Sequence, residues 1–282
     1  NISASEDLGG VVNGAEYILV ATPSSIFNKI IPRLEPHVDS SAFVISCTKG
    51  IQPDPFSTMT EIISKHLGHV IGDKVGALSG PNLAKEIADQ KIAGTVIASS
   101  NKTLSSEIKT ILSSNTFKVF SSADTQGVEL AGALKNIYAI CCGIAHAKNV
   151  GENALGFIVT RSMAEMSRFA VAKGANPITF LGLAGMGDLM ATCTSKLSRN
   201  FQLGELLGAD MSLKEAKAKV GQVAEGARTL EVVFLEAKKM DVSMPMVDSL
   251  YKILYKDSSS DELIQDLLDH PNEVDVEFTY RD

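Results

Sequence analysis

The first 122 residues alternate short apolar runs with helical stretches, and this alternation restricts the possible folds more than any other feature of the chain. Five runs have the length and composition of buried strands, and several of them end in Gly, Pro, Ser or Thr, where turns begin. These runs are residues 16–24, 42–50, 75–82, 94–100 and 117–122. Continuous apolar runs with helices between them are typical of a largely parallel sheet covered on both faces. The sequence therefore predicts an α/β domain whose ligands bind at the carboxyl ends of the strands.

Strand signals disappear in the second half of the chain, where apolar residues recur with the helical period. The clearest helical patterns are residues 127–147, 156–174, 212–220, 226–240 and 261–270. Ser212 and Ser260 stand where helix caps are expected, and Gly174 follows the end of a predicted helix. We therefore expect two domains, a sheet domain over residues 1–122 and a helical domain over 123–282.

Composition narrows the class of protein. A hydrophobic fraction of 45% and a charged fraction of 21% describe a globular chain, and no run approaches the apolar length of a membrane span. The net charge of −7 and the pI near 5.3 argue against a nucleic-acid-binding or anionic-membrane-binding surface. A local basic pocket for one small anion, either a phosphate or a carboxylate, remains open.

The cysteines indicate neither a metal site nor a disulfide framework. No two of them form a CxxC pair or a Cys/His spacing that zinc requires, and we expect them to be small buried hydrophobes. This usage fits the reducing cytosol, so the sequence predicts a cytoplasmic protein without a bound metal. The four residues are Cys47, Cys141, Cys142 and Cys193.

Lys135 is the only residue between positions 130 and 145 whose side chain is charged at neutral pH. Its neighbours at helical spacing are Ala131, Gly132, Tyr138 and Ala139. Apolar surroundings favour a neutral amine, which suits a general acid or base near neutral pH. The alternative is a structural lysine that extends to the surface or pairs with an acid.

Asp188 follows a glycine-rich stretch that is unusual inside an apolar run. Gly182, Gly185 and Gly187 permit a close backbone approach or uncommon dihedral angles. An acid at this position is either the N-cap of the following helix or a site residue.

Ser198, Arg199 and Asn200 supply a hydroxyl, a forked guanidinium and an amide in succession. This set suits a phosphate monoester, because Arg binds two oxygens while Ser and Asn donate to the others. The start of a solvated helix uses the same Ser and Asn residues.

Three further turns contain candidate site residues. Lys49 follows the second predicted strand, and the segment 80–84 opens a helix whose free N–H groups are suited to meet an anion or a cofactor. For both segments the alternative is a plain turn. Val223 and Glu225 lie in a glycine-flanked turn before another helix, where the alternative is a capping motif.

Five motifs occur in an order that resembles one enzyme family. They are "CTKGI", "SGPNLAKE", "GVELAGALKNIYAI", "GLAGMGDLMATCTSKLSRN" and "GQVAEG". Together they span most of the chain and resemble the bacterial-type NAD(P)-dependent glycerol-3-phosphate dehydrogenases. The last three motifs are specific, since other dinucleotide-binding enzymes do not share them.

The resemblance implies a Rossmann-like domain followed by an all-α domain of the 6-phosphogluconate-dehydrogenase C-terminal type. It implies reversible hydride transfer between NADH or NADPH and C2 of dihydroxyacetone phosphate, which yields sn-glycerol 3-phosphate for phospholipid synthesis. It also implies a cytoplasmic homodimer.

By the same resemblance, Lys135 exchanges a proton with the substrate oxygen, Asp188 orients its amine, and Lys49 reaches the substrate from the sheet side. The substrate-binding residues implied are Lys49, Gly80, Asn82, Lys135, Asp188, Ser198, Arg199 and Asn200. The cofactor-binding residues implied are Lys49, Ala84, Arg199, Val223 and Glu225. Asn82 departs from the family, which more usually has Ser or Thr there.

The glycine-rich GxGxxG-like turn with which the family opens does not occur in these 282 residues. The chain starts with Asn1, and residues 1–15 resemble a region well inside the family's first domain. We therefore expect that roughly fifty residues of the parent protein precede it, the size of a βαβ unit. Two alternatives remain, a related β-hydroxyacid or 6-phosphogluconate-type dehydrogenase and a non-catalytic fragment.

Overall fold

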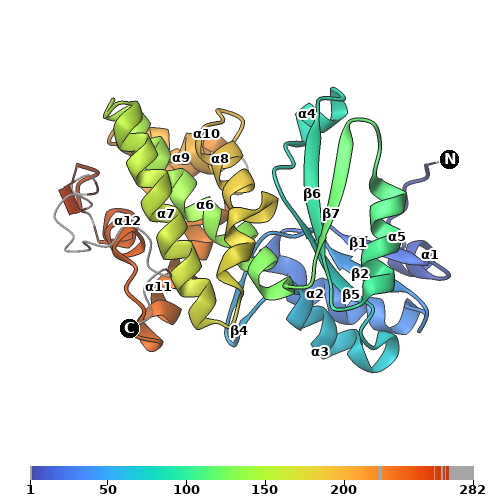
Figure 1. The fold of residues 1–282 in the computed structure, drawn as a ribbon. Helices are drawn as coiled ribbons and strands as arrows, with labels where there is room; N and C mark the ends of the chain where they lie inside the picture. The colour runs from blue at the N-terminus through green and yellow to red at the C-terminus, as the bar shows by residue number, and fades with distance from the viewer. Residues whose placement is uncertain (1, 222–223, 257, 262, 264, 267–282) are drawn as a thin grey trace. The chain divides into compact units, whose positions relative to one another are not determined.

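The structure is a computed structural model and describes residues 2–221, 224–256, 258–261, 263 and 265–266. It divides into two units, Asn1–Leu130 and Ala131–Asp282. The first contains a sheet with helices and the second is helical (Figure 1). One helix, α6 (Thr125–Ala147), runs across the division.

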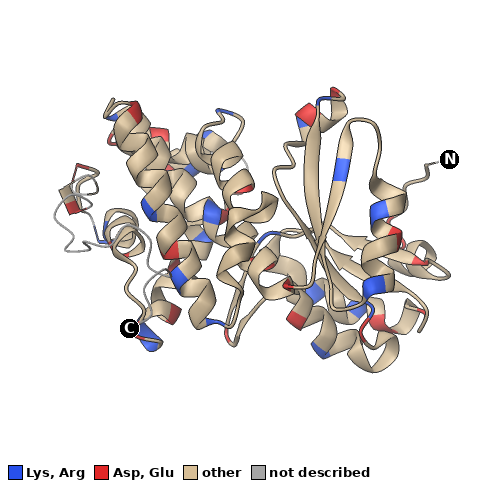
Figure 2. Ribbon diagram, viewed as in Figure 1, with Lys and Arg blue, Asp and Glu red and all other residues tan. Residues whose placement is uncertain are grey.

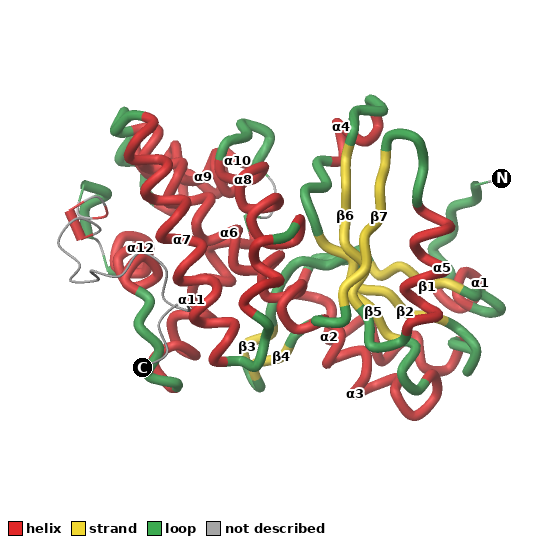
Figure 3. The backbone as a smooth tube through the Cα atoms, in the orientation of Figure 1, coloured by secondary structure: helices red, strands yellow, loops and turns green. Residues whose placement is uncertain are grey.

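The first unit is built on a five-stranded sheet of order β1-β2-β5-β6-β7 (Figure 3). The strands are β1 (Tyr17–Val20), β2 (Phe43–Ser46), β5 (Val75–Ser79), β6 (Ala93–Ala98) and β7 (Phe117–Ser122). All five lie in the predicted runs or within one residue of them. Three neighbouring pairs are parallel, whereas β5 and β6 are antiparallel. The sheet is therefore largely parallel, as predicted, with one reversed connection.

The side chains of the strands alternate between the two faces of the sheet, and apolar side chains on each face pack into a core. Helices α2 (Ser24–Leu34) and α3 (Met59–Ile71) form one apolar core with Val44 and Val75. Helix α5 (Lys102–Leu112) contributes to a second apolar core. The shorter elements are α1 (Leu8–Val12), η1 (Glu35–His37), β3 (Gln52–Pro53), β4 (Phe56–Ser57) and α4 (Ala84–Ala88).

The second unit consists of helices around the central part of α6. Its other elements are α7 (Glu152–Ala172), η2 (Pro177–Leu181), η3 (Leu183–Gly187), α8 (Asp188–Cys193), α9 (Arg199–Gly208), α10 (Leu213–Val220), α11 (Glu225–Lys239) and α12 (Pro245–Tyr255). Four predicted helices coincide with α6, α7, α10 and α11. The fifth, residues 261–270 with Ser260 as its expected cap, lies largely outside the described residues. The predicted boundary signals at Ser212, a capping box, and Gly174, with φ of +92°, are confirmed.

Helix α6 has the length and apolar composition of a membrane-spanning helix, but its apolar window is 100% buried inside the protein. Core helices of globular proteins have the same property. The charged residues of the other helices are mixed in sign (Figure 2). Several form ion pairs, among them Lys173 with Glu236 at 2.7 Å.

Helices α6 and α9 approach each other so closely that only glycine fits at the crossing. A methyl group on Gly143 would overlap the carbonyl oxygen of Phe201, and one on Gly204 would overlap that of Ile140. Direct backbone contact leaves no side chain to adjust, so the glycines fix the distance between the two helices.

Two buried carboxylates bind helix N-termini. On α7, Glu165 accepts hydrogen bonds from Tyr138 Oη at 3.2 Å and from the backbone N–H of Met246, near the start of α12, at 2.6 Å. On α6, Glu129 accepts from the backbone N–H of Thr60, near the start of α3, at 2.9 Å. Burial raises the pKa of each carboxyl to about 7.

We predict that Gly143→Ala and Gly204→Ala each lower the free energy of unfolding by about 1–3 kcal/mol, because the added methyl forces α6 and α9 apart. Urea denaturation measures the change. Gly156→Ala is the matched control, since a methyl on this α7 glycine meets nothing within 4 Å. It should raise stability by up to about 1 kcal/mol. Equal effects at both kinds of site would contradict the packing explanation.

We also predict that Glu165→Gln removes a pH-dependent loss of stability. Burial raises the pKa of the folded carboxyl to about 7, above the ordinary value of 4.5 for a glutamate. The folded state therefore binds the proton more tightly than the unfolded state does. As a result, the protein loses stability as the pH rises from about 4.5 to about 7. Gln keeps the hydrogen-bond pattern of the protonated acid. Between about pH 5 and about pH 8, the variant should gain about 2–3 kcal/mol relative to the parent chain. A difference between the two proteins that does not change with pH would show that Glu165 ionises normally.

Candidate active site

A buried ion pair of the second unit joins Lys135 on α6 to Asp188 on α8. Lys135 Nζ lies 2.6 Å from Asp188 Oδ1. The residues are 6% and 1% exposed to solvent. The lysine does not extend to the surface, and the acid that pairs with it is the second residue selected from the sequence. Isolated buried charges are very unfavourable, so each depends on the other for its place in the core.

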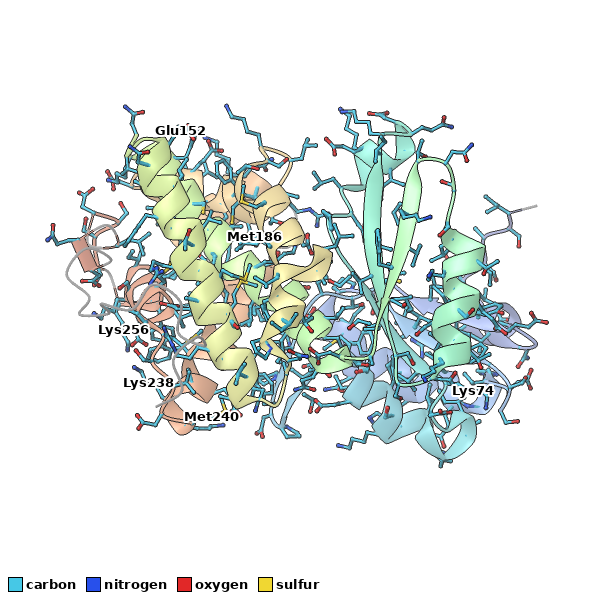
Figure 4. The ribbon with its side chains drawn as sticks, in the orientation of Figure 1. Lys74, Glu152, Met186, Lys238, Met240 and Lys256 are labelled. Carbon is cyan, nitrogen blue, oxygen red and sulfur yellow. The ribbon has the colours of Figure 1, made fainter. Side chains whose placement is uncertain are left out.

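The glycine-rich turn before α8 directs Asp188 inward. Gly185 packs so tightly against the backbone of Phe180 that a methyl group would overlap it. Met186, labelled in Figure 4, lies on this turn. Gly187 is the N-cap of α8 and Asp188 its first residue. The N-cap interpretation of Asp188 is therefore wrong, and its carboxylate binds Lys135 instead.

Thr192 completes the site, although the sequence did not single it out. Its hydroxyl accepts a hydrogen bond from Lys135 Nζ at 2.6 Å and donates one to the main-chain oxygen of Asp188 at 2.6 Å. The i, i+4 spacing of Asp188 and Thr192 places both side chains on one face of α8. That spacing is the sequence signal that identifies the threonine.

The buried thiols of Cys193 and Cys141 remain protonated at neutral pH. A hydrogen bond to Cys142, together with burial, raises the pKa of Cys193 well above its usual value. Burial does the same for Cys141. These thiols therefore add no negative charge beside the amine at neutral pH, and Asp188 acts on Lys135 in apolar surroundings.

Two asparagines connect three helices of the same unit. Asn200 Nδ2, on α9, donates to Asn136 Oδ1 on α6 at 2.9 Å. The backbone N–H of Gly226, on α11, donates to Asn200 Oδ1 at 3.0 Å. Asn136 directly follows Lys135, so this network fixes the turn of α6 that carries the amine. The sequence identified Asn200 but assigned no role to Asn136.

The predicted phosphate-binding cluster lies at the start of α9. Ser198 is the N-cap, and its hydroxyl accepts from the backbone N–H of Phe201 at 3.2 Å. Arg199 and Asn200 are the first two residues of the helix. Ser198 therefore has the structural role that the sequence left open, while its O–H remains able to donate to a ligand.

The predicted residues of the first unit gather at the carboxyl ends of β2 and β5. Lys49 Nζ donates to the carbonyl oxygen of Gly80 at 2.7 Å. A methyl group on Gly80 would lie 2.9 Å from Thr95 Cα, so the backbone approaches β6 closely. Asn82 Nδ2 donates to Thr95 Oγ1 at 2.9 Å, and Ala84 begins α4.

The structure thus groups the predicted residues within the two units. In the first are Lys49, Gly80, Asn82 and Ala84, and in the second are Lys135, Asp188, Ser198, Arg199, Asn200 and Glu225. Glu225 is the first residue of α11. Val223 lies outside the described residues. Within the described ranges, no three His, Cys, Asp or Glu side chains gather as metal ligands.

Two family models match almost the whole chain. Residues 1–105 match the N-terminal domain of NAD-dependent glycerol-3-phosphate dehydrogenase, and residues 124–265 match its C-terminal domain. The chain belongs to the NAD-dependent glycerol-3-phosphate dehydrogenase family. The predicted fold class, a Rossmann-like domain followed by a helical domain, is confirmed.

Known glycerol-3-phosphate dehydrogenases are similar to this protein over nearly its full length. Glycerol-3-phosphate dehydrogenase [NAD(P)+] of Alcanivorax borkumensis is 47% identical over 277 residues, which are 98% of this chain and 80% of the relative. That of Pseudomonas syringae pv. syringae is 44% identical over 96% of this chain and 79% of the relative. The crystal structure of the Coxiella burnetii glycerol-3-phosphate dehydrogenase matches with a TM-score of 0.88 and 34% identity, covering 94% of this chain and 80% of that one.

Enzymes of other specificity share only the fold. A ketopantoate reductase from Ralstonia eutropha matches with a TM-score of 0.55 and 15% identity over 95% of this chain and 81% of that one. The family matches therefore favour the glycerol-3-phosphate dehydrogenases over the β-hydroxyacid and 6-phosphogluconate-type dehydrogenases.

We predict that Thr192→Val lowers turnover by about 10- to 100-fold, because the ammonium loses a charge-assisted hydrogen bond and its fixed position. Thr194→Val is the matched control. Thr194 is exposed, lies directly after α8 and donates to the main-chain oxygen four residues earlier at 2.8 Å. Steady-state kinetics should give the Thr194→Val variant the turnover of the parent chain. Thermal unfolding should show that both variants fold. Unimpaired turnover of Thr192→Val would exclude the threonine from the site.

Proposed function

We propose that Lys135 is the general acid and base of an NAD(P)-dependent glycerol-3-phosphate dehydrogenase. The reaction of this family interconverts dihydroxyacetone phosphate and sn-glycerol 3-phosphate with NAD or NADP. The observation that carries the proposal is the 2.6 Å contact between Lys135 Nζ and Asp188 Oδ1 inside the helical core. A buried amine held by a carboxylate in this way is poised for proton transfer.

Reduction of a ketone needs a hydride at the carbonyl carbon and a proton at its oxygen. NAD(P)H, when bound, supplies the hydride. Lys135 donates the proton from its ammonium group to the oxygen, and in the reverse direction its neutral amine removes the proton from the C2 hydroxyl. Asp188 orients the amine and balances its charge, while Thr192 fixes the nitrogen through the second 2.6 Å contact.

The substrate phosphate is assigned to the start of α9. Arg199 offers two parallel N–H donors, which match two phosphoryl oxygens, and Ser198 and Asn200 lie beside it. The free N–H groups of the first turn add positive potential. In the first unit, Lys49, Gly80 and Asn82 are the substrate-binding candidates.

The carboxyl edge of the sheet fits a bound cofactor. Strands β1, β2 and β5 are mutually parallel, so their carboxyl ends lie at one edge. Buried side-chain oxygens without a hydrogen-bond partner occur in the segments that follow β1 and β5. Buried polar atoms are nearly always hydrogen-bonded, so these oxygens are available to a bound ligand or to water. The residues assigned to the cofactor are Lys49 and Ala84 of the first unit and Arg199, Val223 and Glu225 of the second.

The wider role follows from the chemistry of the product. sn-Glycerol 3-phosphate is the backbone of glycerophospholipids, so we place the reaction in phospholipid synthesis and carbohydrate metabolism. Four free cysteines fit the reducing cytoplasm. The proposal includes a homodimer, and a functional division into a cofactor domain over residues 1–122 and a substrate domain over 123–282.

Lys135→Ala should lower turnover by about 10²- to 10⁴-fold, because it removes the proton carrier. An added small primary amine such as methylamine should restore part of the rate in this variant. Lys148→Ala is the control, since that lysine lies just beyond the same helix and pairs with Asp210 at 3.3 Å. Its turnover should match that of the parent chain. Parent-like turnover in a folded Lys135→Ala variant would remove the assignment.

A further inference from the structure

Glu129 is a buried acid that takes no part in the mechanism described above. It lies in the second turn of α6, just before the apolar run that contains Lys135, and is only 7% exposed to solvent. Its carboxylate accepts hydrogen bonds from the backbone N–H of Thr60 at 2.9 Å, from the Thr60 hydroxyl and from the Thr58 side chain. A carboxylate out of water is costly unless it is hydrogen-bonded, so these contacts hold it in one place.

The groups that bind Glu129 all belong to the start of α3. Thr58 is the N-cap of this helix and Thr60 its second residue. The N–H groups of a first helical turn have no acceptor within the helix, and the carboxylate from α6 supplies one. Glu61 serves the same helix end from within α3, because it forms a capping box with Thr58 and accepts from its N–H at 2.7 Å. Two acids therefore stabilise the start of α3, and Glu129 is the one that connects it to α6.

Helix α3 is a fixed part of the sheet unit. Its residues Met59, Ile63 and Leu67 are fully buried, and they belong to the same apolar core as Val44 of β2 and Val75 of β5. Hydrogen bonds to the first turn of α3 therefore attach the start of α6 to the core of the sheet unit.

The same helix α6 carries Lys135, six residues after Glu129. Six residues advance a helix by about 9 Å and turn it by about 240°, so the two side chains leave α6 in different directions. An effect of Glu129 on Lys135 therefore passes through the helix itself. Directly beyond the lysine, Asn136 is bonded to Asn200 at 2.9 Å. The amine thus lies between two attachments of one helix, Glu129 in the sheet unit and Asn136 in the helical unit.

We propose that Glu129 is a positioning residue for the reaction, because its carboxylate binds the start of α3 and thereby fixes the direction of the helix that carries Lys135. This inference rests on the proposed function, in which the sheet unit binds the hydride donor and Lys135 supplies the proton. Both must reach one carbonyl group, and a misplacement of about 1 Å costs up to about 100-fold in rate. Glu129 acts through α6 and not through a contact with either ligand.

Glu129→Leu removes the acceptor and nearly keeps the side-chain volume. Its kcat should fall about 10- to 100-fold, whereas the KM for dihydroxyacetone phosphate should stay within about twofold, because the substrate-binding residues are unchanged. Steady-state kinetics with NADH or NADPH measures both constants.

Glu129→Gln is the conservative variant. Burial raises the pKa of Glu129 to about 7, so the site already accommodates a neutral acid. The glutamine oxygen accepts from the Thr60 N–H, and its amide group donates to the Thr60 hydroxyl. This variant should therefore restore kcat to within about threefold of the parent chain.

Glu61→Ala is the matched control at the same helix end. It breaks the capping box of α3 but leaves the contact with α6 in place. The midpoint of thermal unfolding should fall by about 2–4 °C. Turnover should stay within about twofold of the parent chain, which separates a general loss of stability from the loss of the α6 attachment.

Amide hydrogen exchange of the ligand-free chain gives a readout that needs no cofactor. In Glu129→Leu, the amides of residues 126–134 should exchange at least about 10-fold faster than in the parent chain, because the first turns of α6 have lost their attachment. In Glu61→Ala the same amides should stay within about twofold of the parent rates.

Four results overturn the positioning role. They are parent-like kcat in a folded Glu129→Leu variant, a KM that rises while kcat is unchanged, unchanged exchange of the α6 amides, and a Glu129→Gln variant as slow as Glu129→Leu. If Glu129→Leu does not fold, Thr60→Val decides, because it deletes one donor by a nearly isosteric change. Its kcat should fall by about threefold or more at an unchanged KM, and parent-like turnover overturns the proposal.

Failure of this inference is distinguishable from failure of the proposed function. If Glu129 has no positioning role, the parent chain still reduces dihydroxyacetone phosphate and Lys135→Ala is still defective. A parent chain that does not reduce dihydroxyacetone phosphate contradicts both.

Discussion

A buried ion pair determines how the helical unit is organised. Taking an ammonium and a carboxylate out of water is costly, and their attraction compensates only if the contact is short and other hydrogen bonds complete it. Lys135 and Asp188 meet these conditions at 2.6 Å, with Thr192 as a further partner of the amine. Removal of either partner leaves an uncompensated charge in the core. The pair therefore holds α6 and α8 in one arrangement and keeps the Lys135 amine inside the core.

The rest of the unit keeps that arrangement rigid. Gly143 and Gly204 bring α6 and α9 into backbone contact, and the asparagine network joins both to the start of α11. Glu165 joins α6 and α7 to the start of α12. The sheet unit works differently, since its polar groups collect at the carboxyl edge of parallel strands and some of them still need a partner. Among the described residues, the buried side-chain oxygens without a partner all lie in the sheet unit.

Much of this was predictable from periodicity and residue type. The five strands and four of the helices follow from apolar patterns, and Lys135 was identified because it is the only charge in an apolar run. The antiparallel pairing of β6 with β5 was not predictable, because an apolar run does not indicate in which direction its strand runs in the sheet. Thr192 was missed because a threonine inside a helix has many ordinary uses, and only the partner four residues earlier distinguishes it. For Asp188, local sequence allowed both a cap and a site residue, and the partner that decides between them lies 53 positions away.

The central claim, that Lys135 and Asp188 form a coupled pair in the core, is tested most directly by a double-mutant cycle on the free energy of unfolding. Lys135→Met and Asp188→Leu each leave one buried charge without its partner, while the double variant leaves none. The account predicts a coupling energy of at least about 2 kcal/mol, with the double variant more stable than the sum of the single effects implies. Single effects that add to within about 0.5 kcal/mol would contradict it.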